Sequence, residues 1–447
     1  MKDFIKQAAH VKPNANQLRM LTETPFYAFV HFGPNTSTGL EWGNGTEDPS
    51  VFNPCELDCD SWCEAFKSAG MTGVVLTAKH HDGFCLWQSK YTEHCMKNSP
   101  YKDGKGDVVR ELSEACRCHG LKFGFYLSPW DRNSKLYGTP EYNVYYKNQL
   151  TELLTGYGDI FYVWFDGACG EGPNGKKQEY DFDGYFELIE KYQPNAAIFN
   201  DRGNIRWCGN EAGDTRYAEW SVVPSELCPY CEIQTKPGPF AGELSYMYNT
   251  NENIGALSNI MYSKGLVFAP SEVDMSIRPG WFYHPEEEPH SLDRLFDTYI
   301  RTVGGNTTFN LNVPPMPNGK LDARDIERLS QLGSKIKQSF GHNLAEGKEI
   351  THSPCGESDT QQIIDIDLKG KTKVDYLVLC ENIAQGQRVE NFFVQKLNEY
   401  GLWDNVFEGT TIGFKRIIPL NGTETEKLRV FIVSSRDTPD ISEISVY

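Results

Sequence analysis

The chain has 447 residues and a formal net charge of −18 at neutral pH. This length is too large for one ordinary core and suits a barrel-sized domain of about 250 to 330 residues followed by a smaller one. The acidic balance argues against nucleic acid and anionic membrane surfaces as partners, because a polyphosphate partner needs a basic face. A neutral small ligand is the partner class that the composition favours.

Nothing in the sequence predicts insertion into a membrane. There is no run of about 18 apolar residues, and the first residues lack the pattern of a secretory signal peptide. The compartment is left open: periplasmic or secreted if a leader has been removed, and otherwise cytoplasmic. The oligomeric state is equally open, and an acidic chain of this size is compatible with a monomer.

Strand-like and helix-like segments alternate through most of the chain, which predicts a parallel sheet there. Helices are expected at 60–69, 140–157, 180–192 and 249–262. Another is expected between Asp107, which can cap its first turn, and Gly120, which can end it. Eight apolar segments predict the strands of a closed (β/α)8-type barrel: 28–32, 73–78, 122–127, 159–165, 196–201, 215–221, 265–269 and 307–313.

The pattern changes after a long helix that is expected at 322–340. Short alternating strands separated by turn residues follow, and they predict a C-terminal antiparallel β-sandwich. We expect a barrel domain at 1–341 and a sandwich domain at 342–447. The expected sandwich strands are 362–368, 373–380, 392–396, 414–419, 428–433 and 441–447.

Polar and aromatic residues follow four of the predicted barrel strands, at the carboxyl ends where βα-loops build barrel active sites. Each group alone can be explained as a capped loop or a hydrogen-bonded histidine, but the four groups together indicate an active site. Neutral histidines offer a donor and an acceptor to a sugar diol, and tryptophans offer apolar surfaces with an N–H donor. The groups are residues 31–34 with 41–43, then 79–84, 126–130 and 164–166.

Two spacings could suggest a metal. His80 and His81 are adjacent, so on an extended chain they point to opposite faces, and the HxH and HExxH spacings are missing. Cys228 and Cys231 have the spacing of a zinc or redox site, but no partner CxxC or HxxxH follows them. We therefore expect no metal and no cofactor, and mostly free thiols among the 13 cysteines.

Cleavage of a sugar linkage needs two carboxyl groups across the scissile bond. Asp166 ends a predicted buried strand and is followed by glycine, so it is the first candidate. Glu211, in a glycine-flanked loop, and Glu219, on the next predicted strand, are both eligible as the second. Glu219 also has a structural interpretation, as a loop cap or as the ion-pair partner of Arg202 or Arg206.

The motifs at these positions closely resemble those of α-L-fucosidases of glycoside hydrolase family 29, in order and spacing, over about residues 15–335. Two further segments, 206–213 and 276–283, resemble the branch of that family that cleaves α-1,3 and α-1,4 fucosyl linkages. The motifs are FVHFGP at 29–34, EWG at 41–43, KHHDGF at 79–84, YLSPW at 126–130, VWFDG at 163–167, and GGN at 304–306 with LNVPP at 311–315.

The resemblance implies a retaining exo-α-L-fucosidase with Asp166 as the nucleophile and Glu211 as the acid/base. The interval between these two residues is in keeping with that branch, whereas Glu219 falls later than its pattern. The implied substrate is a fucosylated oligosaccharide or glycoconjugate. The implied fucose-binding residues are His31, Glu41, Trp42, His80, His81, Tyr126, Trp164, Arg278 and Trp281.

Two alternatives stay open. One is the same mechanism on a related sugar such as an α-L-galactoside, because an apolar site for the C5 methyl rejects an added hydroxyl only weakly. The other is a fucose-binding protein without turnover, although both candidate carboxylates are present. Whether the C-terminal sandwich braces the barrel or binds carbohydrate is also open.

Overall fold

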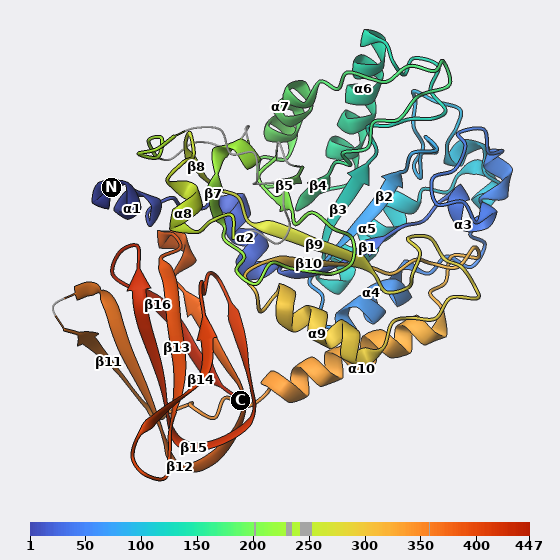
Figure 1. Ribbon diagram of the computed structural model, residues 1–447. Coiled ribbons are helices and arrows are strands. Elements are labelled where there is room, and N and C mark those ends of the chain that lie inside the picture. Colours follow the sequence, from blue (N-terminus) through green and yellow to red (C-terminus); the bar gives the residue numbers. More distant parts are fainter. Residues whose placement is uncertain (201–202, 229–234, 242–252, 357) are drawn as a thin grey trace.

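The computed structural model describes residues 1–200, 203–228, 235–241, 253–356 and 358–447, and it consists of a β/α barrel followed by antiparallel sheets (Figure 1). Eight strands form the barrel sheet, and a parallel bridge between Phe199 and Ile205 joins its two ends. The predicted fold class is confirmed. In barrel order the strands are β1 (Phe26–Val30), β2 (Gly73–Lys79), β3 (Lys122–Leu127), β4 (Tyr162–Trp164), β5 (Ala197–Phe199), β6 (Arg206–Trp207), β9 (Ser271–Ser276) and β10 (Thr308–Asn312).

Both faces of the barrel strands are buried, which is why they occur in the sequence as continuous apolar runs. In β1, Tyr27 and Phe29 belong to a cluster that fills the barrel interior together with tyrosines and a tryptophan from β3 and β4. The alternate residues Phe26, Ala28 and Val30 belong to a second cluster, between the strands and the surrounding helices.

Helices cover the outside of the barrel (Figure 1). The sequence signals at α5 are confirmed: the Asp107 side chain accepts the N–H of Arg110, and Gly120 ends the helix with a φ of 70°. Among the described residues, no helix combines the length and the apolar character needed to cross a membrane. The helices are α1 (Lys2–Ala8), α2 (Ala15–Glu23), α3 (Pro34–Thr38), α4 (Cys59–Ser68), α5 (Val108–His119), α6 (Pro140–Gly156), α7 (Phe182–Tyr192), α8 (Leu257–Ile260), α9 (Leu292–Thr302) and α10 (Ala323–Phe340).

The prediction of barrel strands at 215–221 and 265–269 is wrong. The nearby strands β7 (Val222–Pro224) and β8 (Leu266–Phe268) form a separate antiparallel pair, and β6 and β9 complete the barrel instead. The pattern of β9 does not indicate a barrel strand, because Glu272 and Asp274 alternate with apolar residues. Both carboxyl groups are nevertheless buried and hydrogen-bonded. Of the helix expected at 249–262, α8 covers the end, and 249–252 lie outside the described residues.

The C-terminal sandwich is built around two long strands that pair with each other along separate stretches, with a register shift between Asp367 and Thr372. The strands expected at 362–368 and 373–380 are therefore two parts of β12, and those expected at 414–419 and 428–433 fall largely within β15. The strands are β11 (Glu349–Cys355), β12 (Ser358–Glu381), β13 (Val389–Leu397), β14 (Trp403–Gly409), β15 (Arg416–Ser435) and β16 (Ile441–Val446).

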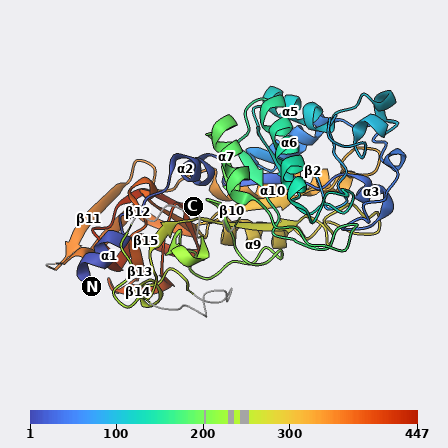
Figure 2. The ribbon, with the colours of Figure 1, turned by 90° about the horizontal axis from the view of Figure 1, so that it is seen from above.

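The sandwich lies beside the barrel and shares its core (Figure 2). The Ile417 N–H donates to the Gly304 carbonyl at 2.9 Å, and the Phe414 N–H donates to Asn306 Oδ1 at 2.8 Å. Near the N-terminus, His10 contacts Asp437 of the sandwich at 2.7 Å. Five sandwich side chains belong to the same apolar cluster as the outer barrel core: Val378, Cys380, Ile383, Phe414 and Ile417.

Candidate active site

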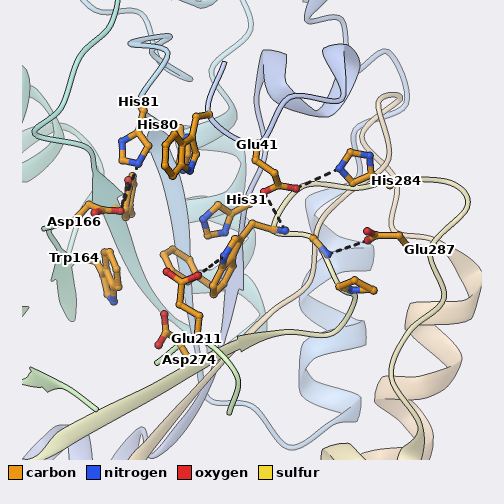
Figure 3. Close-up of a pocket in the computed structure, with 16 residues that line it drawn as sticks. His31, Glu41, His80, His81, Trp164, Asp166, Glu211, Asp274, His284 and Glu287 are labelled. Atoms are coloured by element: carbon orange, nitrogen blue, oxygen red, sulfur yellow. Dashed lines mark hydrogen bonds and ion pairs between the residues drawn. The ribbon is translucent and has the colours of Figure 1, made fainter. Parts of the chain in front are cut away.

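The loops that follow the barrel strands surround a cavity of about 590 Å³ (Figure 3). The lining side chains come from β1, β2, β3, β4, β6 and β9 or from the loops after them, so side chains far apart in the sequence converge as expected for a barrel. The lining residues are Phe29, His31, Glu41, Trp42, His80, His81, Tyr126, Trp164, Asp166, Glu211, Asp274, Pro279, Gly280, Trp281, His284 and Glu287.

Asp166 follows β4 and is held on both of its carboxylate oxygens. Oδ2 accepts the hydroxyl of Tyr126 at 3.0 Å, and Oδ1 accepts the backbone N–H of Ala168 at 2.7 Å. Burial and the neighbouring Asp166 carboxylate raise the pKa of Tyr126 well above its ordinary value, so its hydroxyl keeps the proton that it donates. The carboxylate of Asp166 is thereby fixed in one orientation toward the cavity.

His81 faces Asp166 with a nitrogen that carries no proton. The Ser128 hydroxyl donates to the Trp130 carbonyl at 2.7 Å, so it accepts from Nδ1 of His81, which lies 2.7 Å away. Burial lowers the pKa of His81 and leaves the ring neutral near pH 7. Its Nε2, 3.7 Å from Oδ2 of Asp166, is therefore an acceptor for a hydroxyl placed between them.

Two further histidines of the cavity, His31 and His80, are also neutral. Burial lowers the pKa of His31 to about 3 and the pKa of His80 well below its ordinary value. Nδ1 of His80 is buried and has no hydrogen-bond partner among the described residues. The ring of His80 is nearly parallel to that of Tyr126, with centroids 5.6 Å apart. Three uncharged imidazoles thus present polar atoms to one small cavity.

Glu211 lies on the exposed loop after β6 and is contacted by Trp281. The indole N–H of Trp281 donates to Oε2 of Glu211 at 3.0 Å. The backbone N–H of Trp281 in turn donates to Oε2 of Glu41 at 3.2 Å, and His284 Nε2 lies 3.3 Å from Oε1 of Glu41. Glu41 therefore supports the loop that carries Trp281, in addition to lining the cavity (Figure 3).

The structure separates the two candidates for the second carboxyl group. Glu219 does not line the cavity; it is 1% exposed, and its oxygens lie 2.8 Å from Arg206 and 3.0 Å from Arg216. Burial alone would raise the pKa of Glu219, but the two guanidinium groups hold it below its ordinary value. The structural interpretation of Glu219 is confirmed, with Arg206 as one partner; Arg202 lies outside the described residues.

Of the three predicted tryptophans that line the cavity, Trp42 and Trp164 lie at very different depths. Trp42 is 60% exposed at the rim, where its ring meets that of Trp130 edge-on at 5.8 Å. Trp164 is buried, lies stacked on Phe199 at 4.1 Å, and donates its indole N–H to Glu272 at 2.7 Å. One tryptophan therefore edges the entrance and the other forms part of the floor.

Of the fucose-binding residues that the resemblance implies, Arg278 is the one that the structure does not bring to the cavity. Its side chain is buried, and its Nε lies 3.1 and 2.8 Å from the two carboxylate oxygens of Asp325 in α10. Its charge is compensated there and holds the loop after β9 to that helix. The interpretation of Arg278 as a substrate contact is therefore not supported by its position.

Asp274 lines the cavity and was missed together with its strand. The indole N–H of Trp207 donates to Oδ1 of Asp274 at 2.9 Å. Burial raises the pKa of Asp274 well above its ordinary value, and the carboxylates of Glu272 and Glu211 add to this effect. Glu272, Asp274 and Ser276 alternate with apolar residues, a pattern typical of a strand with one solvated face, so the sequence gives no signal that this face lies inside a barrel.

The described residues contain no group of three or more histidine, cysteine or carboxylate side chains arranged to hold a metal. Of the cysteine pair with CxxC spacing, Cys228 is buried, and Cys231 lies outside the described residues. The cavity is lined by five carboxyl groups, among them Asp166 and Glu211 on separate loops, together with imidazoles and indoles. This donor set matches a polyhydroxylated ring and acid/base chemistry.

Comparisons with known proteins show which family this chain is similar to. The profile of the α-L-fucosidase family matches residues 27–339. Alpha-L-fucosidase 1 of Arabidopsis thaliana is 38% identical, over 94% of this chain and 84% of that protein. The crystal structure of a glycoside hydrolase 29 family member from a rumen bacterium has a TM-score of 0.86 at 40% identity and covers 98% of this chain and 77% of that one.

A Ruminococcus gnavus GH29 fucosidase, solved in complex with fucose, has a TM-score of 0.81 at 32% identity. That match covers 98% of this chain and 95% of the other. The agreement extends over the barrel and the sandwich, and the curated relatives are named as fucosidases. The chain belongs to the α-L-fucosidases of glycoside hydrolase family 29.

Proposed function

We propose that this α-L-fucosidase is a retaining, exo-acting enzyme in which Asp166 is the nucleophile and Glu211 is the acid/base. The observation that carries the proposal is that these two carboxyl groups, from the loops after β4 and β6, line the same small cavity. Each is held by an aromatic donor, Tyr126 for Asp166 and Trp281 for Glu211. If the enzyme retains the anomeric configuration, we expect its two carboxyl groups to lie about 5 to 5.5 Å apart during the reaction.

The reaction would proceed in two displacements. Asp166 attacks the anomeric carbon while the bond to the leaving oxygen breaks, and Glu211 gives its proton to that oxygen. Glu211, now a carboxylate, takes a proton from water, and the resulting hydroxide displaces Asp166 from the fucosyl ester. Fucose leaves with its original anomeric configuration, and both carboxyl groups return to their starting protonation states.

The remaining lining residues are suited to hold the sugar. Neutral imidazoles accept hydroxyl hydrogens without adding charge, which suits His31, His80 and His81 for an uncharged ring. Glu41 and the tryptophans complete the proposed binding set, with indole faces against the apolar C5 methyl group. Below the cavity, Glu272 binds Trp164 and Tyr162, so the floor is filled by side chains. A cavity closed at its floor suits a terminal sugar and therefore exo action.

For the linkage we propose α-1,3 and α-1,4 fucosides of branched oligosaccharides or glycoconjugates. The support is the resemblance of segments 206–213 and 276–283 to the corresponding branch of the family. These two segments carry Glu211 and Trp281, which meet at the cavity edge where the leaving group must lie. Comparing the release of fucose from α-1,2, α-1,3 and α-1,4 linked trisaccharides tests this part alone.

The carboxyl roles are tested by chemical rescue. Asp166→Ala and Glu211→Ala are assayed on an aryl α-L-fucoside with and without azide, and the products are identified by NMR. We expect β-fucosyl azide from Asp166→Ala, because azide replaces the nucleophile, and α-fucosyl azide from Glu211→Ala, because azide attacks the fucosyl-enzyme. The wild type should release α-fucose first.

The matched control is Glu287→Gln, because Glu287 is another cavity carboxylate but accepts a backbone N–H from Gly280 at 3.0 Å. It should give no azide product. Full activity of Glu211→Ala, or release of β-fucose by the wild type, would overturn the assignment.

A further inference from the structure

Asn312, the last residue of β10, is completely buried and uses every hydrogen-bonding position of its side-chain amide. Oδ1 accepts the backbone N–H of His31 at 3.1 Å and lies 2.9 Å from Nδ1 of the same residue. Nδ2 donates to the carbonyl of Trp281 at 2.8 Å and to the hydroxyl of Ser276 at 2.9 Å. One amide therefore contacts both the His31 side and the Trp281 side of the cavity.

The orientation of this amide is fixed by partners that have only one possible role. The Trp281 carbonyl can only accept, so the amide nitrogen must face it, and the His31 backbone N–H can only donate, so the amide oxygen must face His31. Nδ1 of His31 lies against that same oxygen and must carry a hydrogen. Nε2 of His31 is left as a bare acceptor.

We propose that Asn312 is a positioning residue of this enzyme: it sets His31 as a hydrogen-bond acceptor toward a substrate hydroxyl and holds Trp281 against Glu211. The proposal deepens the proposed function, since it takes the cavity as the fucose site and Glu211 as the acid/base. Asn312 does not line the cavity, so it would act through His31 and Trp281.

The surroundings of His31 explain why an amide rather than a carboxylate is required there. His80 and Tyr126 lie 5.5 and 6.2 Å from the His31 ring, measured between ring centroids, and both are uncharged. Burial lowers the pKa of His31 most, and the neighbouring His81 lowers it further. The carboxylates that line the same cavity are Glu41, Asp166, Glu211, Asp274 and Glu287.

A carboxylate in place of the Asn312 amide would reverse the role of His31. It would pair with Nδ1, raise the pKa of the imidazole and favour the form that carries a hydrogen on both nitrogens. Nε2 would then donate where it should accept. The Asp side chain would also lack the N–H that now binds the Trp281 carbonyl.

The first measurement uses the wild-type enzyme with ¹⁵N-labelled histidine. Among the ten histidines, the His31 signals are identified as those lost in His31→Gln. We expect His31 with a protonated Nδ1 and an unprotonated Nε2 from pH 5 to pH 8. A proton on Nε2 in this range would overturn the proposal, whatever the activity. A wild type inactive on fucosides would count against the proposed function, whereas the nitrogen signals would still decide the role of Asn312.

The second measurement compares Asn312→Asp with Ser276→Ala, which removes one partner on the Nδ2 side and introduces no charge. Asn312→Asp should show His31 protonated on both nitrogens, and its kcat/KM should fall roughly tenfold at pH 6. Activity should recover in part as pH rises through the new His31 pKa, because deprotonation restores the acceptor while the contact with the Trp281 carbonyl stays lost. Ser276→Ala should retain the wild-type nitrogen signals. An unchanged pH profile in a folded Asn312→Asp enzyme would contradict the proposal.

Discussion

Tyr126 donates its hydroxyl hydrogen to Oδ2 of Asp166 across 3.0 Å, and so links strand β3 to the loop after β4 at the base of the cavity. The phenol lies among buried groups and keeps its proton at all physiological pH values. The bond therefore acts on the orientation and charge distribution of Asp166 rather than on proton transfer.

Tyr126→Phe should lower kcat/KM on an aryl α-L-fucoside by about 100-fold, because a preorganised donor to the reacting carboxylate is lost. The free energy of unfolding should fall by only about 1 kcal/mol. The control is Tyr146→Phe, which removes an equally buried hydroxyl that donates to the Leu127 carbonyl at 2.7 Å and does not line the cavity. It should cost similar stability and less than about twofold in activity. Equal activity of the two variants would contradict a role for the Tyr126 hydroxyl.

Trp281→Phe should affect substrates according to their leaving groups. The variant removes the N–H that Glu211 accepts at 3.0 Å, so Glu211 is less well placed to protonate the leaving oxygen. Acid assistance matters most when the leaving group is a sugar and least when it is an activated phenol. We expect kcat/KM to fall roughly 10- to 100-fold on a trisaccharide and far less on a dinitrophenyl fucoside.

Trp130→Phe is the control for this leaving-group comparison, because Trp130 donates instead to the Glu171 carbonyl at 3.1 Å. An equal loss on both substrates in Trp281→Phe would show that Trp281 does not act through Glu211.

Glu219→Gln should act on stability rather than on chemistry. The substitution leaves two buried guanidinium groups, Arg206 and Arg216, without their carboxylate. Breaking a buried ion pair by removing one partner costs about 3 to 5 kcal/mol, which urea unfolding would measure. Glu93→Gln breaks a pair with Lys97 in which the Glu93 side chain is 82% exposed, and it should leave the urea unfolding midpoint nearly unchanged. A stable but inactive Glu219→Gln enzyme that azide restores would instead make Glu219 the acid/base.

The free energy of unfolding should fall as pH drops below about 6.5, partly because of His80. Burial lowers the pKa of His80 in the folded protein, so the unfolded chain takes up a proton first as the solution becomes acidic. Stability that is present above the unfolded pKa is therefore lost as pH falls, by up to about 1.4 kcal/mol per pH unit for this group. In His80→Gln the slope between pH 6 and pH 4 should be flatter by up to that amount. Equal slopes in urea unfolding would contradict the prediction.

The sequence could predict elements whose signals are local. Asp107 and Gly120 mark the two ends of α5. An N-cap residue and a C-terminal glycine each act on the nearest turn of the helix, so the sequence shows both signals directly. Strand β9 could not be recognised in this way. Glu272 of this strand has a charged side chain and would be expected at the surface. It is buried because its carboxyl group accepts hydrogen bonds from Tyr162, Trp164 and other residues distant in the chain.

The site residues divide in the same way, into those with a local sequence signal and those whose position depends on residues distant in the chain. Most of the cavity residues come from motifs at strand ends, and the barrel geometry brings such positions together whatever the loops contain. Arg278 stood in a suitable motif, but its charge is taken by Asp325, 47 positions further along the chain. Asp274 could not be placed without its strand. Charge compensation over long sequence separations was the information that the pattern lacked.

The sharing of one apolar core by barrel and sandwich has a practical consequence for shortening this enzyme. A chain cut after α10 would expose the barrel surface that Phe414 and Ile417 now cover, and it would leave the Gly304 carbonyl without the Ile417 N–H. Exchanging the sandwich for another module would require grafting those contacts as well. Fusion partners and tags should therefore be attached away from the contact surface between the barrel and the sandwich, and neither region should be replaced by them.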